Sequence, residues 1–307
     1  MYQLISKSKL WLSISTVLVV ASIIMLAMWG LKLGIDFTGG SLMEVTFNQD
    51  RPSVTEIEEK LKDLNLKSLT VQPVGDNGTI LRFQETSQEV HEAIQLRLNG
   101  FDADPKDQTS AYEEQRFEAV GPSIGQELQR KAIYSIILVL IAISAYIAWA
   151  FRKVSRPVAS WKYGVATLVS LFHDVVIVLG AFAYLGHFQG VEINTTFVAA
   201  VLTVLGFSVH DTIVVFDRIR ENLPRSNDNF ANTVNMSLNQ TITRSVNTSL
   251  TVMIVLLVIV VMGGMSIHYF ALALLIGIFF GTYSSIFLAS PLVVVWHHGF
   301  PKRETVA

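Results

Sequence analysis

The sequence contains no cysteine and few charged residues. The absence of cysteine among the 307 residues excludes disulfide frameworks, thiolate metal sites and cysteine nucleophiles. Charged residues make up 16% of the chain and hydrophobic residues 51%, and the mean hydropathy is +0.45. Because soluble domains average about 25% charged residues, this composition argues against an ordinary cytosolic enzyme.

The charges are also unevenly distributed along the chain. Between Gly34 and Leu128 there are 18 acidic and 8 basic residues, whereas the rest of the chain has 7 acidic and 15 basic residues. One acidic, soluble segment is therefore set into a basic, apolar remainder. A nucleic-acid-binding protein is expected to have a basic soluble domain, so no nucleic acid is expected as a partner.

Six apolar stretches are long enough to cross a lipid bilayer, which takes about 20 residues in a helix. The first follows Lys7 and Lys9 and could be a signal peptide, but it is too long for a secretory signal and lacks a clear cleavage motif. We therefore interpret it as an uncleaved span. The six predicted spans are Leu10–Leu31, Ala132–Phe151, Tyr163–Leu185, Thr195–Phe216, Asn239–Val261 and Tyr269–Trp296.

Lysine and arginine residues near the span ends predict the orientation, because they collect on the cytoplasmic side. One side has only Lys32, Arg130 and Lys131. The other side has Lys7, Lys9, Arg152, Lys153, Arg156, Lys162, Arg218, Arg220, Arg225, Lys302 and Arg303. We therefore expect both termini in the cytoplasm. The predicted parts are a cytoplasmic N-terminus with the first span (1–33), an outer domain (34–128), a five-helix membrane region (129–298) and a cytoplasmic tail (299–307).

The outer segment has the pattern of a small α+β domain. Ser53 and Glu56 form a capping box that starts a helix, and a second helix carries apolar residues at four-residue spacing. The predicted strands are 42–47, 69–74, 79–83 and 116–120, and the helices end near Leu64 and Asn99. This β-α-β-β-α-β order predicts a ferredoxin-like domain. It contains no catalytic triad, metal-ligand spacing or phosphate loop, so we expect a binding or lever module without metal or cofactor rather than an enzyme.

Ionisable residues within the predicted spans require an explanation, because each costs about 2.5–3.5 kcal/mol near the bilayer centre. His173 and Asp174 lie in the third span, and His210 and Asp211 lie in the fourth. Asp174 could simply pair with His173 in a structural role. For His210, a structural hydrogen bond to a neighbouring span is favoured over proton transfer. Gly206, close to Asp211, would allow a neighbouring helix to approach.

Arg244 is the expected partner of Asp211, because a buried carboxylate is best compensated by a buried cation. Arg244 could instead extend to the cytoplasmic interface. Helical spacing places it on one polar face with Gln240, Thr243, Asn247 and Thr248, and this face must point into the bundle or towards water. A carboxylate that alternates between an arginine partner and water changes its pKa. Such a change is what a proton carrier coupled to a conformational change requires.

These motifs resemble the SecF family of the bacterial SecDF protein-export complex, which is related to the resistance-nodulation-division transporters. The resemblance extends from about residue 10 to about residue 298. Its strongest signals are an Asp-Phe-Thr-Gly-Gly string and an Asp-Arg-Ile-Arg-Glu-Asn string. The matching segments are 34–40, 120–125, 173–175, 206–212, 216–222 and 237–249.

The resemblance implies a six-span protein of the bacterial inner membrane with a periplasmic ferredoxin-like domain. It implies SecD, the SecYEG channel and an unfolded preprotein as partners, with YajC as an optional further one. It assigns the proton-linked carboxylate to Asp211 and an essential arginine to Arg244. Relatives often have Asn where this chain has His210, which leaves the hydrogen bonding beside Asp211 open.

Glycine residues flank the outer domain at both of its connections to the membrane. Gly39 and Gly40 follow Asp36 in the first family motif, and Gly121 and Gly125 belong to the second. They could act as hinges between the outer domain and the spans, or they could serve ordinary turn geometry.

The sequence supports three functions. The favoured one is a proton-driven export subunit in which Asp211, Arg244, His210, Asp174, His173 and Asn247 form the proton pathway. The main alternative is a non-catalytic scaffolding subunit whose intramembrane charges serve helix packing. A small-molecule exporter is disfavoured because the outer domain is small. Replacing Asp211, Arg244 or Asn247 by apolar residues would distinguish the proton-driven subunit from the scaffolding subunit, because only a proton carrier requires these residues.

Overall fold

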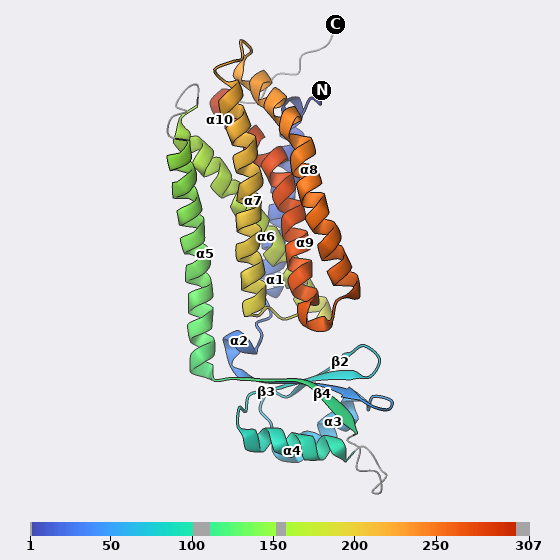
Figure 1. The fold of residues 1–307 in the computed structure, drawn as a ribbon. Helices are drawn as coiled ribbons and strands as arrows, with labels where there is room; N and C mark the ends of the chain where they lie inside the picture. Colours follow the sequence, from blue (N-terminus) through green and yellow to red (C-terminus); the bar gives the residue numbers. More distant parts are fainter. Residues whose placement is uncertain (1, 101–110, 152–157, 299–307) are drawn as a thin grey trace. The chain divides into compact units, whose positions relative to one another are not determined.

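The computed structural model describes residues 2–100, 111–151 and 158–298. The chain divides into two compact units, one comprising residues 1–32 with 132–307 and the other comprising residues 33–131. The first is a helical unit and the second is built on a β-sheet (Figure 1).

The helices of the helical unit cover all six predicted spans. They are α1 (Ser8–Trp29), α5 (Pro122–Ala150), α6 (Ser160–Gln189), α7 (Thr195–Asn222), α8 (Phe230–Met262) and α9 (Met265–Ser284). A π-helix (Ser285–Ala289) and α10 (Ser290–His298) continue α9, and together they form the sixth span. The six-span prediction is confirmed.

Helix α8 extends beyond the predicted fifth span. We expected the span to begin at Asn239, but α8 begins at Phe230, where the Asn229 side chain caps the helix by accepting a hydrogen bond from the Asn232 amide at 2.9 Å. The nine additional residues are rich in Asn, Ser and Thr. Apolarity marks only the part of a helix that lies in hydrocarbon, so a polar extension of the same helix escapes a hydropathy criterion.

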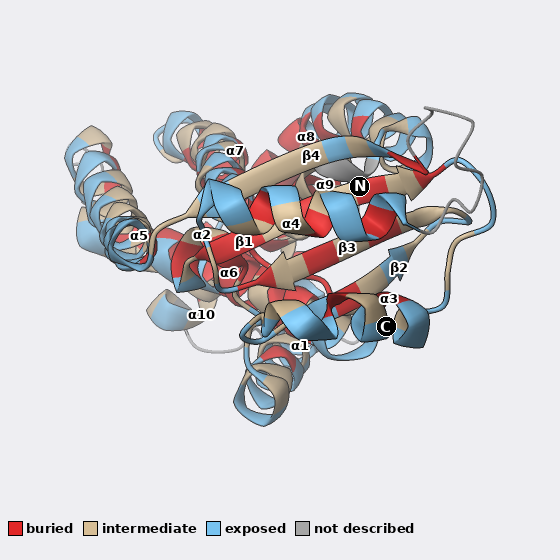
Figure 2. Ribbon diagram, turned by 90° about the horizontal axis from the view of Figure 1, so that it is seen from below, coloured by how far each residue is buried: buried red, intermediate tan, exposed pale blue. Residues whose placement is uncertain are grey.

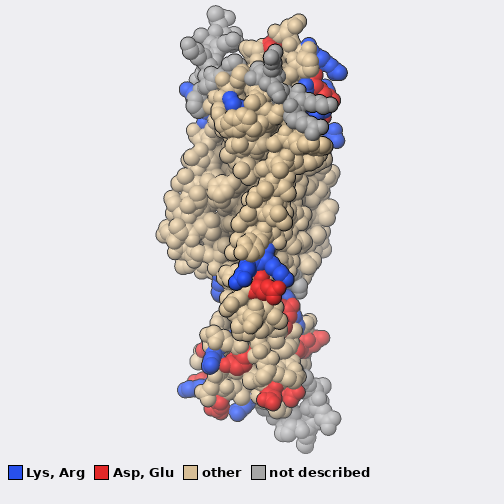
Figure 3. All heavy atoms as spheres, turned by 90° about the vertical axis from the view of Figure 1, so that its left-hand side faces the viewer, with Lys and Arg blue, Asp and Glu red and all other residues tan. Residues whose placement is uncertain are grey.

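Burial differs strongly among the spans. α6 is the most enclosed helix, whereas α1, α5 and α8 leave most of their surface uncovered within this chain. The helical core includes Tyr163, Phe216 and Leu238, which are all fully buried. On the face of the helical unit seen in Figure 3, charged side chains gather near one end and a long middle band is uncharged, as hydrocarbon contact requires.

The sheet unit has four antiparallel strands in the order β2-β3-β1-β4. The strands are β1 (Gly40–Phe47), β2 (Thr70–Val74), β3 (Gly78–Phe83) and β4 (Tyr112–Val120). Three helices accompany them, α2 (Ile35–Thr38), α3 (Val54–Leu61) and α4 (Gln88–Asn99), and a 3₁₀ turn (Lys62–Leu64) extends α3. The element order confirms the ferredoxin-like prediction.

One face of the sheet is covered by α3 and α4 (Figure 2). Alternate residues of β1, Met43 and Val45, point to this face and are fully buried against a core that includes Ile57 and Ile94. Strand alternation of this kind is what the sequence predicted for 42–47. β4 begins at Tyr112, four residues earlier than expected, and burial raises the pKa of the Tyr112 phenol to about 12.

The predicted capping box of α3 is present. Ser53 Oγ accepts a hydrogen bond from the Glu56 amide at 3.3 Å, and Glu56 Oε2 accepts one from the Ser53 amide at 2.8 Å. The hydrogen bonds that the Ser53 amide and hydroxyl donate to the Glu56 carboxylate hold the pKa of this carboxyl below its ordinary value.

Candidate functional site

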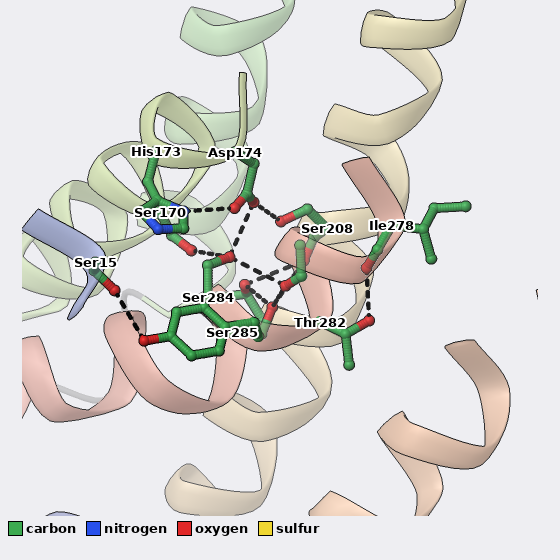
Figure 4. Close-up of polar contacts among 12 residues, drawn as sticks. Ser15, Ser170, His173, Asp174, Ser208, Ile278, Thr282, Ser284 and Ser285 are labelled. Carbon is green, nitrogen blue, oxygen red and sulfur yellow. Dashed lines mark hydrogen bonds and ion pairs between the residues drawn. The ribbon is translucent and has the colours of Figure 1, made fainter. Parts of the chain in front are cut away.

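Asp174 lies on α6 and is fully buried in a cage of hydrogen-bond donors (Figure 4). Its Oδ2 atom accepts hydrogen bonds from Ser208 Oγ on α7 at 2.6 Å and from Ser284 Oγ on α9 at 2.9 Å. Ser170 Oγ donates in turn to Ser284 Oγ at 2.9 Å. The carboxylate therefore joins three helices through neutral hydroxyl groups.

His173 provides the remaining contact of Asp174. Its Nδ1 atom lies 2.9 Å from Asp174 Oδ1, so the local pair that the sequence left open is formed. The imidazole is 2% exposed and is stacked near the ring of Tyr283. Its Nε2 atom has no hydrogen-bond partner within the described residues. A buried polar atom in this state is an uncommon feature of folded proteins and accompanies functional sites.

Asp211 lies on α7, three residues after Ser208, and is 3% exposed. Its Oδ2 atom accepts hydrogen bonds from Ser249 Oγ on α8 and from Thr282 Oγ1 on α9, both at 3.3 Å. Thr282 Oγ1 also lies 2.6 Å from Ser249 Oγ. This second cage is looser than that of Asp174, since its donors are fewer and more distant.

The expected pairing of Asp211 with Arg244 is not formed within this chain. Among the described residues Arg244 forms no ion pair, and its side chain is exposed. The buried side of α8 is instead a row of hydroxyl residues at four-residue spacing, Thr241, Ser245 and Ser249. Arg244 lies about 100° away from Ser245 around the helix, and its polar neighbours Gln240, Thr243, Asn247 and Thr248 are exposed with it.

Two further expectations for α7 are corrected. His210 is exposed and forms no hydrogen bond to a neighbouring span within the described part of the chain. A Cβ at Gly206 would meet nothing within 4 Å, so none of the described helices makes a close contact there. Both residues lie on the side of α7 that faces away from α6 and α9.

The close helix contact is formed by glycines of α9 instead. A Cβ at Gly281 would lie 2.9 Å from Ser208 Cβ, and one at Gly277 would lie 3.0 Å from Val204 Cβ. The signal was present in the sequence as a Gly-x-x-x-Gly motif in an apolar span. Our sequence interpretation missed it, together with the α9 donors Thr282 and Ser284, because it searched the spans for charged residues.

The motif residues of the sheet unit form a compact corner. Gly39 and Gly40 have φ values of +75° and +122°, which side chains rarely adopt. A Cβ at Gly39 would lie 2.8 Å from Pro122 Cα, and one at Gly125 would lie 3.0 Å from the Gly39 nitrogen. Asp36 is half-buried in the first turn of α2. These positions require glycine for turn geometry and close packing, whereas Gly121 does not, because a Cβ there would meet nothing within 4 Å.

Among the described residues, no group of three or more His, Asp or Glu side chains could hold a metal ion. The two candidate centres of the helical unit are therefore carboxylates surrounded by hydroxyl groups. Such centres can hold a proton or form hydrogen bonds.

Comparisons with known proteins agree with this architecture. A family model described as "Protein export membrane protein SecD/SecF, C-terminal" matches residues 102–299, and a "SecD/SecF GG Motif" model matches residues 26–50. A Protein translocase subunit SecF from Thermobaculum terrenum is 43% identical over 300 residues, covering 93% of this chain and 90% of its own length. The protein of the same name from Haemophilus influenzae is 36% identical over 302 residues, covering 97% and 86%.

Solved structures show the same likeness. The crystal structure of SecDF, a translocon-associated membrane protein from Thermus thermophilus, matches with a TM-score of 0.80 and 32% identity. The match covers 96% of this chain but 38% of that SecDF chain. A super-membrane-facing form of SecDF matches with a TM-score of 0.66.

The fold and its caged carboxylates define a six-span membrane protein with one ferredoxin-like domain, in the SecD/SecF class. Within that class, the identity to SecF subunits over more than nine-tenths of the chain is decisive: the chain belongs to the SecF family.

Proposed function

We propose that this protein is a subunit of the bacterial protein-export machinery that uses the proton gradient to promote preprotein export. The observation that carries the proposal is the environment of Asp211, a carboxylate buried in a membrane span and held by two neutral hydroxyl groups. A carboxylate without a buried cation is expensive in such a place, so its protonation state can follow small changes in its surroundings. The names of its SecF relatives support the role in export.

A SecD chain is the proposed partner in the membrane. The SecDF chain that this protein resembles is much longer than this protein, which covers 38% of it. In this chain the polar face of α8 that includes Arg244 and Asn247 is uncovered, and polar side chains in a membrane span need a protein or water partner. We infer that SecD covers this face and that Arg244 approaches Asp211 only in the assembled complex.

The proposed arrangement has both termini in the cytoplasm and the sheet unit in the periplasm. Its support is the excess of lysine and arginine at one set of span ends. The SecYEG channel is the proposed neighbour of the assembled complex, with YajC as an optional subunit.

The sheet unit is the proposed contact for an unfolded preprotein. Strands β1 and β3 are the two central strands of the sheet, so neither has an open edge. Their available surface is the face turned away from α3 and α4, which includes Leu42, Glu44 and Ile80. Photocrosslinkers at these three positions should capture an arrested preprotein more strongly than crosslinkers in the 225–229 loop.

The central experiment is export of a reporter preprotein in cells that lack the native subunit, with and without a proton gradient. Asp211→Asn keeps the size of the side chain and removes its titration, so we expect loss of gradient-stimulated export. Asp211→Glu should retain part of it. Arg244→Lys should lie between wild type and Arg244→Ala, because lysine retains the charge without the planar fork.

Asp217→Asn is the matched control, since Asp217 lies on the same helix but is exposed and paired with Arg220 at 2.9 Å. This variant should export normally. Full gradient-stimulated export by Asp211→Asn at normal abundance would contradict the proposal and favour the scaffolding function. Copurification of a SecD chain, lost on Asn247→Leu, would support the proposed α8 interface.

A further inference from the structure

Helix α9 supplies one hydroxyl group to each of the two buried carboxylates. Ser284 Oγ lies 2.9 Å from Asp174 Oδ2, and Thr282 Oγ1 lies 3.3 Å from Asp211 Oδ2. The two donors are two residues apart on α9, whereas the two carboxylates lie on different helices, α6 and α7. A displacement of α9 therefore changes the hydrogen bonding of both carboxylates together.

The Thr282 hydroxyl has more acceptors than it can serve. Its single proton has three acceptors within reach, Asp211 Oδ2 at 3.3 Å, Ser249 Oγ at 2.6 Å and the Ile278 carbonyl at 2.9 Å. A hydrogen bond to an ionised carboxylate is stronger than one to a neutral group. The orientation of this hydroxyl therefore depends on whether Asp211 is charged.

Two glycines of α9 form its close contact with α7. Gly277 and Gly281 of α9 lie directly against Val204 and Ser208 of α7. Close approach of this kind occurs where small residues meet within membranes. Because the two glycines have no side chains that interlock with α7, the hydroxyl contacts described above contribute to the register between the helices.

A π-helix follows α9 at the level of this site. Residues Ser285–Ala289 form it, and α10 continues from Ser290. Ser285 Oγ lies 3.3 Å from the Ser208 carbonyl of α7, and Ser290 Oγ lies 3.3 Å from the Ser285 carbonyl. π turns interrupt the regular helix ladder and are frequent at functional sites. This one separates α9 from α10, so the two are not one regular α-helix.

We propose that α9 couples the two carboxylates, with Thr282 and Ser284 as its positioning residues. Neutralising Asp211 releases the Thr282 hydroxyl and lets α9 shift along α7, which moves Ser284 relative to Asp174. The inference rests on the proposed proton-coupled function, which it deepens by naming the moving helix.

The absence of cysteine among the 307 residues makes a direct test simple, because introduced cysteines are the only ones in this chain. Val204→Cys with Gly277→Cys joins α7 to α9, and Ser22→Cys with Gly180→Cys joins α1 to α6 as the matched control. A Cβ at Gly277 would lie 3.0 Å from Val204 Cβ, and one at Gly180 would lie 2.5 Å from Ser22 Cβ. Both pairs reach disulfide geometry after a shift of about 1 Å.

The first measurement is gradient-stimulated export with each pair reduced and oxidised, in the complex with its partner. Oxidation of the 204/277 pair should reduce stimulated export at least about tenfold, with recovery on reduction, whereas the 22/180 pair should change it less than about twofold. Full export with the oxidised 204/277 pair, or equal loss with both pairs, would overturn the proposal.

The second measurement is the rate of 204/277 disulfide formation in membranes without a gradient. Asp211→Asn should change this rate about fivefold, the population change that one net hydrogen bond supports. The effect should disappear in Thr282→Val, which has nearly the same shape, and return in Thr282→Ser, which restores the hydroxyl. An unchanged rate in Asp211→Asn, or an undiminished effect in Thr282→Val, would overturn the coupling.

These measurements separate the two proposals. If the gradient does not stimulate export even with reduced cysteines, the proposed function fails, and the disulfide rates still decide the coupling. If the 204/277 pair does not accumulate in membranes, the Thr282 variants without added cysteines decide the coupling. Export must then fall in Thr282→Val and recover in Thr282→Ser. Equal export by wild type, Thr282→Val and Thr282→Ser overturns the proposal.

Discussion

The Ser208 hydroxyl on α7 donates a hydrogen bond of 2.6 Å to Asp174 Oδ2 on α6. Both residues are buried, and Ser208 lies one helical turn from Asp211. The same short stretch of α7 therefore carries one carboxylate and donates a hydrogen bond to the other.

We expect Ser208→Ala to destabilise the helical unit. Removing one partner of a buried hydrogen bond costs about 1–3 kcal/mol, and this substitution leaves the buried Asp174 carboxyl group with one hydrogen-bond partner fewer. Thermal unfolding of the full chain in detergent should show a lower Tm. Thr203→Val is the control, because its hydroxyl lies on the exposed side of α7 and bonds only the Ala199 carbonyl. Equal Tm values for the two variants would contradict this assignment.

The N-terminal segment is held to α8 by asparagine side chains. Asn235 Oδ1 accepts hydrogen bonds from the Leu4 and Ile5 amides at 2.9 and 3.2 Å, and its Nδ2 donates to the Tyr2 carbonyl at 3.0 Å. We expect Asn235→Ala to expose the segment to protease at least about fivefold faster, because three hydrogen bonds are lost. Asn232→Ala should leave the cleavage rate unchanged. Equal cleavage rates in both variants would contradict the proposed role of Asn235 in holding the N-terminal segment.

Alanine should be tolerated at one glycine of the sheet unit and should destabilise the unit at another, depending on how closely other atoms pack there. Gly39→Ala introduces a Cβ 2.8 Å from Pro122 Cα at a φ of +75°, so we expect a loss of about 1–3 kcal/mol in stability. Gly121→Ala meets nothing within 4 Å and should be tolerated. Membrane abundance and Tm of the two variants provide the measurement. If Gly39→Ala is as stable as Gly121→Ala but loses export, the hinge interpretation gains support over the turn interpretation.

The capping box should make the stability of α3 depend on pH. The hydrogen bonds from Ser53 lower the pKa of Glu56 in the folded state, so their contribution is present above the unfolded pKa and is lost as the pH falls through the folded value. Ser53→Ala should therefore reduce amide-exchange protection of α3 about fivefold at pH 7 and less at pH 3.

Ser87→Ala is the control for this pH dependence. Ser87 Oγ caps α4 by accepting from the Val90 amide at 3.4 Å, and no carboxylate completes a box there. Its effect on protection should be the same at both pH values. A pH-independent effect of Ser53→Ala would contradict the role of Glu56.

Sequence alone determined the elements and their order. Six long apolar runs define six helices, because backbone groups in hydrocarbon must be satisfied within the segment. The capping residue Ser53 and the strand alternation of 42–47 are local signals of a few residues each. Such signals depend only on residues that are close together in the sequence.

Only the tertiary structure decided which residues surround the carboxylates. The donors of Asp211, Ser249 and Thr282, lie 38 and 71 residues away on two other helices. Adjacent positions on a helix point about 100° apart, so the rotation of α8 about its own axis decides whether Arg244 or Ser245 lies at the buried face. Helix rotation is set by how all the spans pack together, through contacts such as that of Gly281 with Ser208.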